Sequence, residues 1–380
     1  MKRLVILTEI ISPYRIPLFN TLAKQPGVDL HVIFLAETDP SLRQWQVYKN
    51  EIQFSYEVLS SWRKRVGRYN VLLNFGLGRS LKKAAPDLIL CGGYNYLASW
   101  QALFWARHHD IPFLLWSESN LQDIRRGHAL IELLKHEFLK QCAGFVVPGQ
   151  SAREYLRAQR MSDSRIFTAP NAVDNELFHS AAEVARRNAA ALRTELRLPS
   201  RYFLFVGRLV PEKGVFDLLL AYAKLNEATR QQIGLVYAGD GPYRRQLEEQ
   251  AAGVSGMIRF AGFAQRDQLA SYYALAEMLI LPTYSDPWGL VVNEAMACGL
   301  PVIVSRVAGC AADLVRENWN GLLVSSGDIE SLKTAMETIA CNPDQRASMA
   351  ANSIQLVSCY TPAEWSRGVM NVMASPGGQA

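Results

Sequence analysis

Short runs of apolar residues alternate with stretches in which apolar residues recur every three or four positions, almost from end to end of the chain. Runs of about four to eight apolar residues are typical of strands buried on both faces, and the recurring stretches are typical of amphipathic helices. This alternation of strands and helices predicts the α/β class, with parallel sheets covered by helices on both faces.

In the first half of the chain the pattern predicts strands and helices in regular succession. The predicted strands are Leu4–Leu7, Leu30–Leu35, Tyr56–Leu59, Leu88–Cys91, Pro112–Trp116, Gly144–Val147 and Ile166–Ala169. The predicted helices include Pro17–Lys24, Leu97–His108, Leu130–Gln141 and Ala152–Gln159.

The second half repeats the alternation after a break. Turn residues at Pro170–Asp174 precede a polar, alanine-rich helix predicted over Ala181–Leu196, and we place the domain boundary there. We therefore predict two doubly wound, Rossmann-like domains over residues 1–178 and 179–360, with a C-terminal helix at about 361–374 that packs back on the first domain. In such sheets ligands bind at the carboxyl ends of the strands, which predicts a cleft between the two domains. The strands predicted for the second domain are Tyr202–Val206, Gly234–Ala238, Ile258–Ala261, Met278–Leu281, Pro301–Val304 and Gly321–Val324.

Composition agrees with a globular protein of this size. The 380 residues are 49% hydrophobic and 20% charged, which excludes a mostly disordered chain. The six cysteines contain no C-x-x-C pair, so we predict neither a zinc site nor a disulfide framework and expect a reducing compartment. The polar Thr8 and Glu9 interrupt the apolar N-terminus, which is expected to be the first strand of a cytoplasmic protein.

The net charge of +5 lies in the first half. Residues 1–180 hold 22 Lys and Arg against 16 Asp and Glu, whereas the remainder holds 18 against 19. The densest cluster, Trp62–Tyr69, mixes arginine and lysine with aromatic residues, which suits an anionic membrane surface or a phosphate-bearing acceptor. A solvated loop is the equally good alternative, and nucleic acid is disfavoured because no binding motif occurs.

The stretch Thr283–Val304 combines a loop, a helix start and a buried strand. Asp286 lies in the loop, and Glu294 lies about one turn into a helix that should begin near Gly289. Two acids beside free backbone amides suit a ligand that carries both hydroxyl and phosphate groups. A capped helix whose acids merely favour its dipole is the alternative.

Two cations follow the first strand of the second domain. Arg208 comes directly after that strand and Gly207, and Lys213 stands where the next helix should begin. Such cations could stabilise the charge that develops on a diphosphate leaving group without a metal. Taken alone, the two residues favour the interpretation as solvated loop cations.

Other glycine turns end neighbouring strands. Gly239 begins a Gly-Asp-Gly-Pro turn, Phe263 follows a strand whose main chain could meet a nucleotide base, and Gly309 lies in a loop suited to phosphate or to a tight turn. The chain has no G-x-x-x-x-G-K-[ST], G-x-S-x-G or H-E-x-x-H motif, which weighs against the enzyme classes that use them.

Together these segments resemble the GT-B fold glycosyltransferases of the large retaining family 4. The resemblance rests on Asp286, seven residues, Glu294 and then Ala295–Val302; on Arg208 and Lys213; and on the turns at Gly239–Pro242 and Pro170–Asp174. The motifs occur in family order over Ala169–Val324, and the likeness of the first half is architectural only.

The resemblance implies transfer of a sugar from a UDP- or GDP-type donor, with retention at the anomeric carbon and without a metal or other cofactor. It implies catalytic roles for Arg208 and Lys213 on the diphosphate, for Glu294 on the ribose and for Asp286 near the sugar. The substrate-binding residues that we expect around them are Gly207, Gly239, Phe263, Trp288, Gly289, Leu290 and Gly309.

Departures from the family pattern affect the sugar and acceptor sites. The first acid is usually Glu, whereas this chain has the shorter Asp286. A histidine that often follows the strand Pro112–Trp116 is replaced by Ser117-Glu118-Ser119, and we expect Glu118 to bind substrate. The usual glycine pair is also missing at Ser12–Arg15.

The expected function is synthesis of a cell-surface polysaccharide, lipopolysaccharide or glycolipid. The partners would be a nucleotide sugar and a glycan, lipid-linked or small hydroxyl acceptor. The expected location is the cytoplasm, with peripheral attachment to the inner face of the membrane as a variant. The alternatives are a sugar-nucleotide epimerase of the same fold and an inactive donor-binding partner protein.

Overall fold

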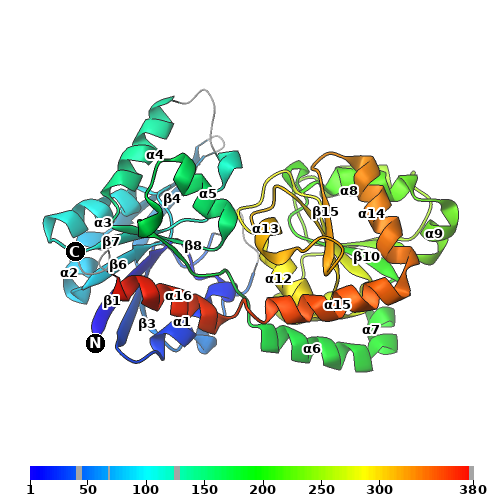
Figure 1. Cartoon of the computed structure of the whole chain (residues 1–380), viewed down its shortest axis with the longest axis horizontal. Coiled ribbons are helices and arrows are strands. Elements are labelled where there is room, and N and C mark those ends of the chain that lie inside the picture. The colour runs from blue at the N-terminus through cyan, green and yellow to red at the C-terminus, as the bar shows by residue number, and fades with distance from the viewer. Residues whose placement is uncertain (40–44, 67–68, 124–128, 376–380) are drawn as a thin grey trace. The chain divides into compact units, whose positions relative to one another are not determined.

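The chain folds into two compact units in the computed structural model, which describes residues 1–39, 45–66, 69–123 and 129–375 (Figure 1). Unit 1 comprises Met1–Ala172 and the chain from Pro362 onward, and unit 2 comprises Val173–Thr361. The division falls at residue 172 rather than at the predicted 178. The reason is that α6 (Asn175–Arg187), capped by Asp174, packs on helices of unit 2.

Unit 1 is built on a parallel sheet of seven strands in the order β3-β2-β1-β6-β7-β8-β9. From β1 the chain builds β2 and β3 on one side and then crosses to β6 on the other, so the switch point of the sheet lies between β1 and β6. The strands are β1 (Lys2–Thr8), β2 (Val28–Phe34), β3 (Ser55–Val58), β6 (Leu88–Cys91), β7 (Phe113–Trp116), β8 (Gly144–Val147) and β9 (Ile166–Thr168).

Helices cover both faces of this sheet. One buried cluster joins the sheet to α2 (Leu77–Ala84), α3 (Leu97–His108), α4 (Ala129–Gln141) and α5 (Gln150–Ala158). The cluster on the other face joins it to α1 (Ile16–Ala23) and α16 (Pro362–Ala374). Figure 1 shows α16, in red, beside the blue α1, and the fully buried Trp365 contacts Phe19 at a ring separation of 5.8 Å.

An antiparallel hairpin of β4 (Ser60–Val66) and β5 (Tyr69–Phe75) stands apart from the main sheet. The sequence pattern did not predict these two strands, because charged residues occupy positions where apolar residues would alternate in a half-buried strand. The basic cluster is therefore part of a hairpin rather than a simple solvated loop. Within the cluster, Gly67 and Arg68 lie outside the described residues.

Unit 2 is built on a parallel sheet of six strands in the order β12-β11-β10-β13-β14-β15, with its switch point between β10 and β13. Each strand lies within about two residues of its predicted position. The strands are β10 (Tyr202–Val206), β11 (Gly234–Ala238), β12 (Ile258–Gly262), β13 (Met278–Leu281), β14 (Val302–Ser305) and β15 (Gly321–Val324).

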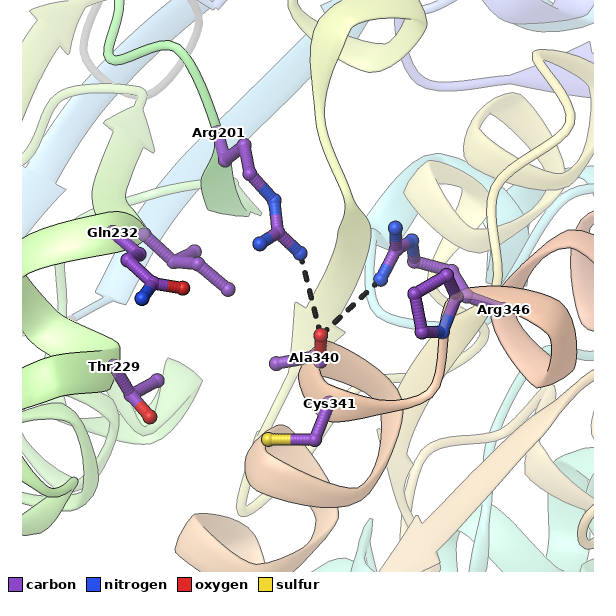
Figure 2. Close-up of a pocket in the computed structure, with 8 residues that line it drawn as sticks. Arg201, Thr229, Gln232, Ala340, Cys341 and Arg346 are labelled. Carbon is purple, nitrogen blue, oxygen red and sulfur yellow. Dashed lines mark hydrogen bonds between the residues drawn. The ribbon is translucent and has the colours of Figure 1, made fainter.

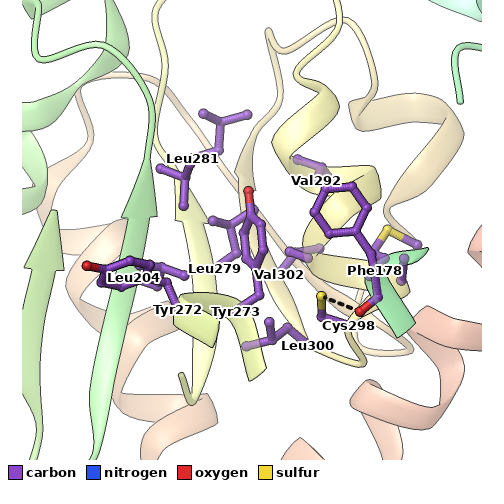
Figure 3. Packing of buried hydrophobic residues seen from close by; sticks show 14 of the residues in the cluster. Phe178, Leu204, Tyr272, Tyr273, Leu279, Leu281, Val292, Cys298, Leu300 and Val302 are labelled. Atoms are coloured by element: carbon purple, nitrogen blue, oxygen red, sulfur yellow. Dashed lines mark hydrogen bonds between the residues drawn. The ribbon is translucent and has the colours of Figure 1, made fainter. Parts of the chain in front are cut away.

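The two faces of this sheet are also covered by helices. One predicted helix, Ala181–Leu196, is divided between α6 and α7 at Asn188. The remaining helices of unit 2 are α7 (Ala189–Glu195), α8 (Val215–Lys224), α9 (Glu227–Gln232), α10 (Arg244–Ala251), α11 (Arg266–Leu275), α12 (Leu290–Ala297), α13 (Ala311–Leu314), α14 (Ile329–Cys341) and α15 (Pro343–Val357). Figure 3 shows the core in which Phe178 of α6 and Tyr273 of α11 pack with strands β10, β13 and β14.

Both sheets are thus doubly wound, as predicted. Among the described helices, none combines the length and the hydrophobicity that crossing a lipid bilayer requires.

Replacement of Trp365 by alanine should destabilise unit 1 by about 3–5 kcal/mol, because it opens a large cavity between α16, α1 and the sheet. Urea unfolding followed by circular dichroism measures the loss. Trp62→Ala, which truncates a half-exposed tryptophan of the hairpin, is the matched control and should change the unfolding free energy by less than about 1 kcal/mol. Equal effects of the two substitutions would contradict the assignment of α16 to the core of unit 1.

Candidate functional site

Glycines bring three strand ends of unit 2 into backbone contact. Gly239 follows β11 with φ of 155°, and a Cβ atom there would lie 1.8 Å from the Gly207 carbonyl oxygen at the end of β10. The Gly239 amide in turn donates to the Gly262 carbonyl of β12 at 2.7 Å. A side chain at Gly239 would therefore force these strand ends apart, so Gly207 and Gly239 shape the carboxyl edge of the sheet.

Arg208 lies at this edge with its side chain exposed. Its carbonyl accepts a hydrogen bond from the Val210 amide at 3.0 Å, whereas its guanidinium group pairs with none of the described residues. An exposed guanidinium group without a carboxylate partner remains available to an anionic ligand.

Lys213 and Asp286, predicted separately, form an ion pair. The Lys213 ammonium lies 2.6 Å from Asp286 Oδ2, and both side chains are largely buried. Lys213 ends a 3-10 turn, Pro211–Lys213, and Gly214 follows with φ of 68°. A Cβ on Gly214 would meet the Pro282 carbonyl at 2.0 Å, so the close approach of this turn to the end of β13 requires glycine.

The loop from Asp286 to Leu290 is held by a second loop through Gly309. The Gly309 amide donates to the Asp286 carbonyl at 3.0 Å, and a Cβ on Gly309 would lie 1.8 Å from the Pro287 carbonyl oxygen. Trp288 is buried, and its indole donates to Asn293 at 2.8 Å. Gly309 and the buried Trp288 side chain therefore fix the conformation of the loop by contacts inside the protein.

Helix α12 begins directly after this loop. Gly289, its N-cap, has φ of 98°, and the Trp288 amide donates weakly to Asp286 Oδ1 at 3.3 Å. The amides of Gly289 and Leu290 donate to none of the described residues. They are available to a phosphate or hydroxyl oxygen at the positive end of the helix.

Glu294 lies on α12, partly buried beneath this loop, and accepts a hydrogen bond of 2.7 Å from Tyr273. Burial raises the pKa of Glu294 to about 7, although the Tyr273 hydroxyl opposes that shift. Tyr273 is fully buried on α11 and was not predicted as a site residue. Nothing in the sequence distinguishes it from a core tyrosine, because its contact with Glu294 joins two separate helices.

Phe263 follows β12 with its ring partly exposed. It therefore lies at the same carboxyl edge of unit 2 as the residues above.

Glu118 lies in unit 1, directly after β7. Its Oε1 atom accepts a hydrogen bond of 3.0 Å from Asn171 and lies 3.7 Å from the Arg15 guanidinium. Asn171 and Arg15 were not predicted as site residues, although both belong to turns noted in the sequence. The Glu118 side chain remains partly exposed at the carboxyl edge of its sheet.

The described residues contain no group of three or more His, Cys, Asp and Glu side chains arranged to hold a metal ion.

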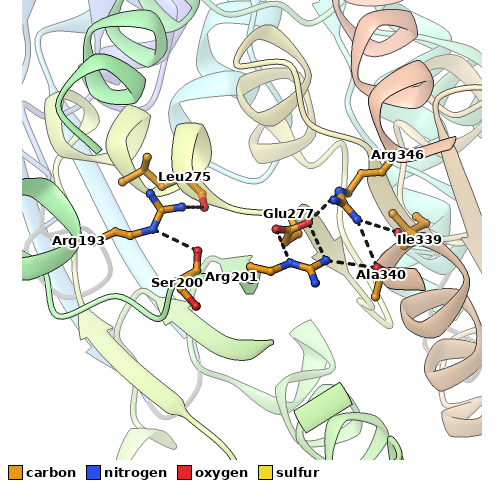
Figure 4. Close-up of polar contacts among 8 residues, drawn as sticks. All are labelled: Arg193, Ser200, Arg201, Leu275, Glu277, Ile339, Ala340 and Arg346. Carbon is orange, nitrogen blue, oxygen red and sulfur yellow. Dashed lines mark hydrogen bonds and ion pairs between the residues drawn. The ribbon is translucent and has the colours of Figure 1, made fainter. Parts of the chain in front are cut away.

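A cavity of about 430 Å³ lies away from the predicted site (Figure 2). Arg201 lies just before β10 and Ile233 just before β11, so the cavity is at the amino edge of the sheet. Figure 4 shows that Arg201 and Arg346 both pair with Glu277, and both also donate to the Ala340 carbonyl at the end of α14. These contacts satisfy the last carbonyls of α14, so Arg201 and Arg346 have a structural role.

Two family models match the chain, one for each unit. The model described as glycosyltransferase family 4 matches residues 18–177, and the model described as glycosyl transferases group 1 matches residues 191–356.

Curated relatives align with part of the chain. D-inositol 3-phosphate glycosyltransferase 2 of Catenulispora acidiphila is 30% identical over 54% of this chain and 49% of its own length. Alpha-D-kanosaminyltransferase of Streptomyces kanamyceticus is 28% identical over 58% of this chain and 57% of its own length. The chain thus spans about half the length of these relatives.

Solved structures share the fold over nearly the whole chain. Anabaena HepE in complex with UDP superposes with a TM-score of 0.77 at 18% identity and covers 98% of this chain and 100% of its own. Sucrose-phosphate synthase of Thermosynechococcus elongatus has a TM-score of 0.76 at 20% identity and covers 100% of both chains.

The ionisation of Glu294 should make unit 2 less stable as the pH rises from about 4.5 to about 7. In that interval the unfolded chain releases the Glu294 proton while the folded chain keeps it, so the folded state loses roughly 3 kcal/mol relative to the unfolded state. Chemical unfolding at a series of pH values measures this. The wild-type curve minus that of Glu294→Gln should show the loss, whereas the wild-type curve minus that of the exposed-residue control Glu249→Gln should be flat, because both proteins keep Glu294. A flat wild-type-minus-Glu294→Gln curve would contradict the raised pKa.

Proposed function

Because this chain belongs to the family 4 glycosyltransferases, the glycosyl transferases group 1 with the GT-B fold, we propose that it transfers a sugar from a nucleotide diphosphate sugar to an acceptor hydroxyl. The main support for this proposal is the set of residues at the carboxyl edge of the unit 2 sheet. There the free Arg208, the Lys213–Asp286 pair and the open amides of Gly289 and Leu290 gather around glycine turns. Cations, amides and carboxylates together suit a nucleotide sugar, which carries both phosphate and hydroxyl groups.

Arg208 and Lys213 would act on the diphosphate. As the bond between the sugar and the phosphate breaks, negative charge grows on the phosphate oxygens, and fixed cations stabilise it more in the transition state than in the substrate. Lys213 already faces Asp286, so a diphosphate would share the ammonium with that carboxylate or displace it. Arg208 has no such competitor among the described residues. No resident metal is needed in this scheme.

Glu294 and Asp286 would hold hydroxyl groups of the donor. Tyr273 occupies one oxygen of Glu294, which leaves the other for the ribose. Asp286, held by Lys213, would lie near the sugar, and its shorter side chain affects which sugar fits. HepE has been solved with UDP and with UDP-glucose, which supports a UDP-type donor here, and a GDP-type donor is the alternative.

The proposed reaction retains the configuration at the anomeric carbon, as the family resemblance implies. The acceptor hydroxyl would attack from the side that the phosphate leaves, and the phosphate would take its proton. Unit 1 would bind the acceptor, and the product would belong to a cell-surface polysaccharide, lipopolysaccharide or glycolipid.

Two other functions predict different products from the same donor. A sugar-nucleotide epimerase of this fold would consume donor without acceptor. An inactive donor-binding partner protein would bind nucleotide sugar and turn over no acceptor. The diphosphate-binding cations Arg208 and Lys213, together with motifs along unit 2 that occur in the order of the glycosyltransferase family, favour transfer.

We also propose a cytoplasmic location with peripheral membrane contact through unit 1. Arg63 of the basic cluster Trp62–Tyr69 forms ion pairs with Glu9 and Asp39. This makes the cluster a weaker candidate for binding an anionic membrane. A better candidate surface is the outer side of α2 and α3, which pack together. Lys82 and Lys83 on α2 and Phe104 on α3 are all exposed, a combination that suits anionic lipid.

Arg208→Ala and Glu294→Ala should each lower the kcat/KM of sugar transfer at least about a hundredfold. The first removes a cation that stabilises charge developing on the phosphate, and the second removes a contact that holds the donor ribose. UDP and GDP should first be compared by thermal shift, since a ligand that binds only the folded state raises the unfolding midpoint. Release of nucleotide diphosphate from a donor panel in the presence of acceptors then measures the rate.

The matched control for this experiment is Arg245→Ala, at an exposed arginine of α10 that should leave the rate unchanged. Near-normal transfer by Arg208→Ala or Glu294→Ala would contradict the proposed site. Donor consumption without acceptor would indicate the epimerase, and donor binding without any turnover would indicate the inactive partner.

The Lys82→Glu/Lys83→Glu variant should lose most binding to vesicles of phosphatidylserine and phosphatidylcholine. Each basic residue near such a surface contributes about 1 kcal/mol, and salt should weaken the wild-type binding in the same way. Sedimentation at low and high salt measures it, with Arg245→Glu in unit 2 as the control. Binding that is absent or insensitive to salt refutes the electrostatic contact.

A further inference from the structure

The switch point of unit 1 lies between the carboxyl ends of β1 and β6 and gathers charged residues from four separate segments. In doubly wound sheets this crevice is where ligands bind. The Gly92 amide, directly after β6, donates to the Leu7 carbonyl of β1 at 2.8 Å, so the two strand ends lie side by side. The residues around this point therefore determine which ligand unit 1 can accept.

Arg15 is the first cation at the switch point, and it is already engaged. Its guanidinium group donates to Thr8 Oγ1 at 2.6 Å, lies 3.7 Å from Glu118 Oε1 and stacks 4.5 Å from the centre of the Trp116 ring. Its side chain is largely buried. Held on three sides in this way, Arg15 orients the Glu118 carboxylate and is not a free cation.

Arg63 is the second cation, and it is neutralised more completely. It reaches from β4 to form ion pairs with the buried Asp39 and with Glu9, the latter at 3.5 Å. Glu9 directly follows Thr8 and lies near Tyr96, the N-cap of α3 after β6. Burial, followed by the charge of Glu9, raises the pKa of Tyr96, so its hydroxyl stays protonated.

Among the residues that the structure describes, three carboxylates thus face two guanidinium groups, an excess of one negative charge. A phosphate group entering here would have to separate an arginine from its carboxylate and leave that carboxylate unpaired, which costs binding free energy. Sugar hydroxyls carry no charge and can donate hydrogen bonds to carboxylate oxygens. Glu118 Oε2 is available for this, since it has no hydrogen bond to the described residues, and the Glu118 side chain is partly exposed.

We propose that the switch point of unit 1 selects a neutral polyol acceptor, bound through its hydroxyl groups by Glu118 and Glu9, and discriminates against an acceptor that carries phosphate at the recognised group. Arg15 and Arg63 are positioning residues that hold the two carboxylates. This inference rests on the proposed function, because it names the acceptor class of the same transfer. The proposed preference for a neutral acceptor differs from the phosphorylated compound in the name of the relative D-inositol 3-phosphate glycosyltransferase 2.

The test measures binding of matched ligand pairs to the full chain by saturation-transfer NMR. Glucose is compared with glucose 6-phosphate, and myo-inositol with inositol 3-phosphate. At least one neutral member should bind at least tenfold more tightly than its phosphorylated partner. Glu118→Gln and Glu9→Gln keep the shape of the side chain but each removes one negative charge. Each should weaken binding of the neutral ligand and free an arginine for the phosphate. The ratio of the two affinities should therefore fall at least threefold.

The control for these variants is Glu137→Gln, at an exposed residue of α4, which should leave both affinities unchanged. Unchanged thermal midpoints confirm that the variants fold. Equal or tighter binding of the phosphorylated members, no binding of any member, or an unaltered preference in both Glu variants overturns the proposal. Nucleotide diphosphate binding is recorded in parallel: if UDP and GDP do not bind, the proposed transfer fails, whatever the outcome for the polyols.

Discussion

The structure of unit 2 depends on main-chain contacts that leave no room for a Cβ atom. Gly239 packs against the Gly207 carbonyl, Gly214 against the Pro282 carbonyl and Gly309 against the Pro287 carbonyl, each at a distance that any other residue would violate. These contacts bring consecutive loops together at one edge of the parallel sheet. They place Lys213 against Asp286 and leave the first amides of α12 open.

The electrostatics of the carboxyl edges of the two sheets differ. Unit 2 offers an unpaired Arg208 and a helix N-terminus, both favourable to phosphate. At the switch point of unit 1, Arg15 and Arg63 are paired with Glu118, Asp39 and Glu9, which among the described residues is one carboxylate more than guanidinium groups. Under the proposed function, an anionic donor would suit unit 2 and a neutral acceptor would suit the switch point of unit 1.

Most of the fold could be predicted from the chain, because strands buried on both faces of a parallel sheet form continuous apolar runs. Positions such as Leu88–Cys91 and Met278–Leu281 agree between pattern and structure. The β4–β5 hairpin was missed, since Arg63 and Lys64 interrupt any apolar alternation. The division of the chain at residue 172 was missed by six residues, because Asp174 caps a helix that belongs to unit 2 through packing that local sequence does not reveal.

The sequence by itself determined the class of fold, the order of the motifs and the residue types at the edge of unit 2, because local periodicity and glycine spacing are properties of neighbouring residues. Only the tertiary structure decided which charges meet. Lys213 and Asp286 are 73 positions apart, and Arg15 and Glu118 lie more than a hundred apart, so no local pattern could show that they form ion pairs. Tyr273 became a partner of Glu294 for the same reason: burial and pairing depend on how distant segments pack, and these decide whether a charge is free to bind a ligand.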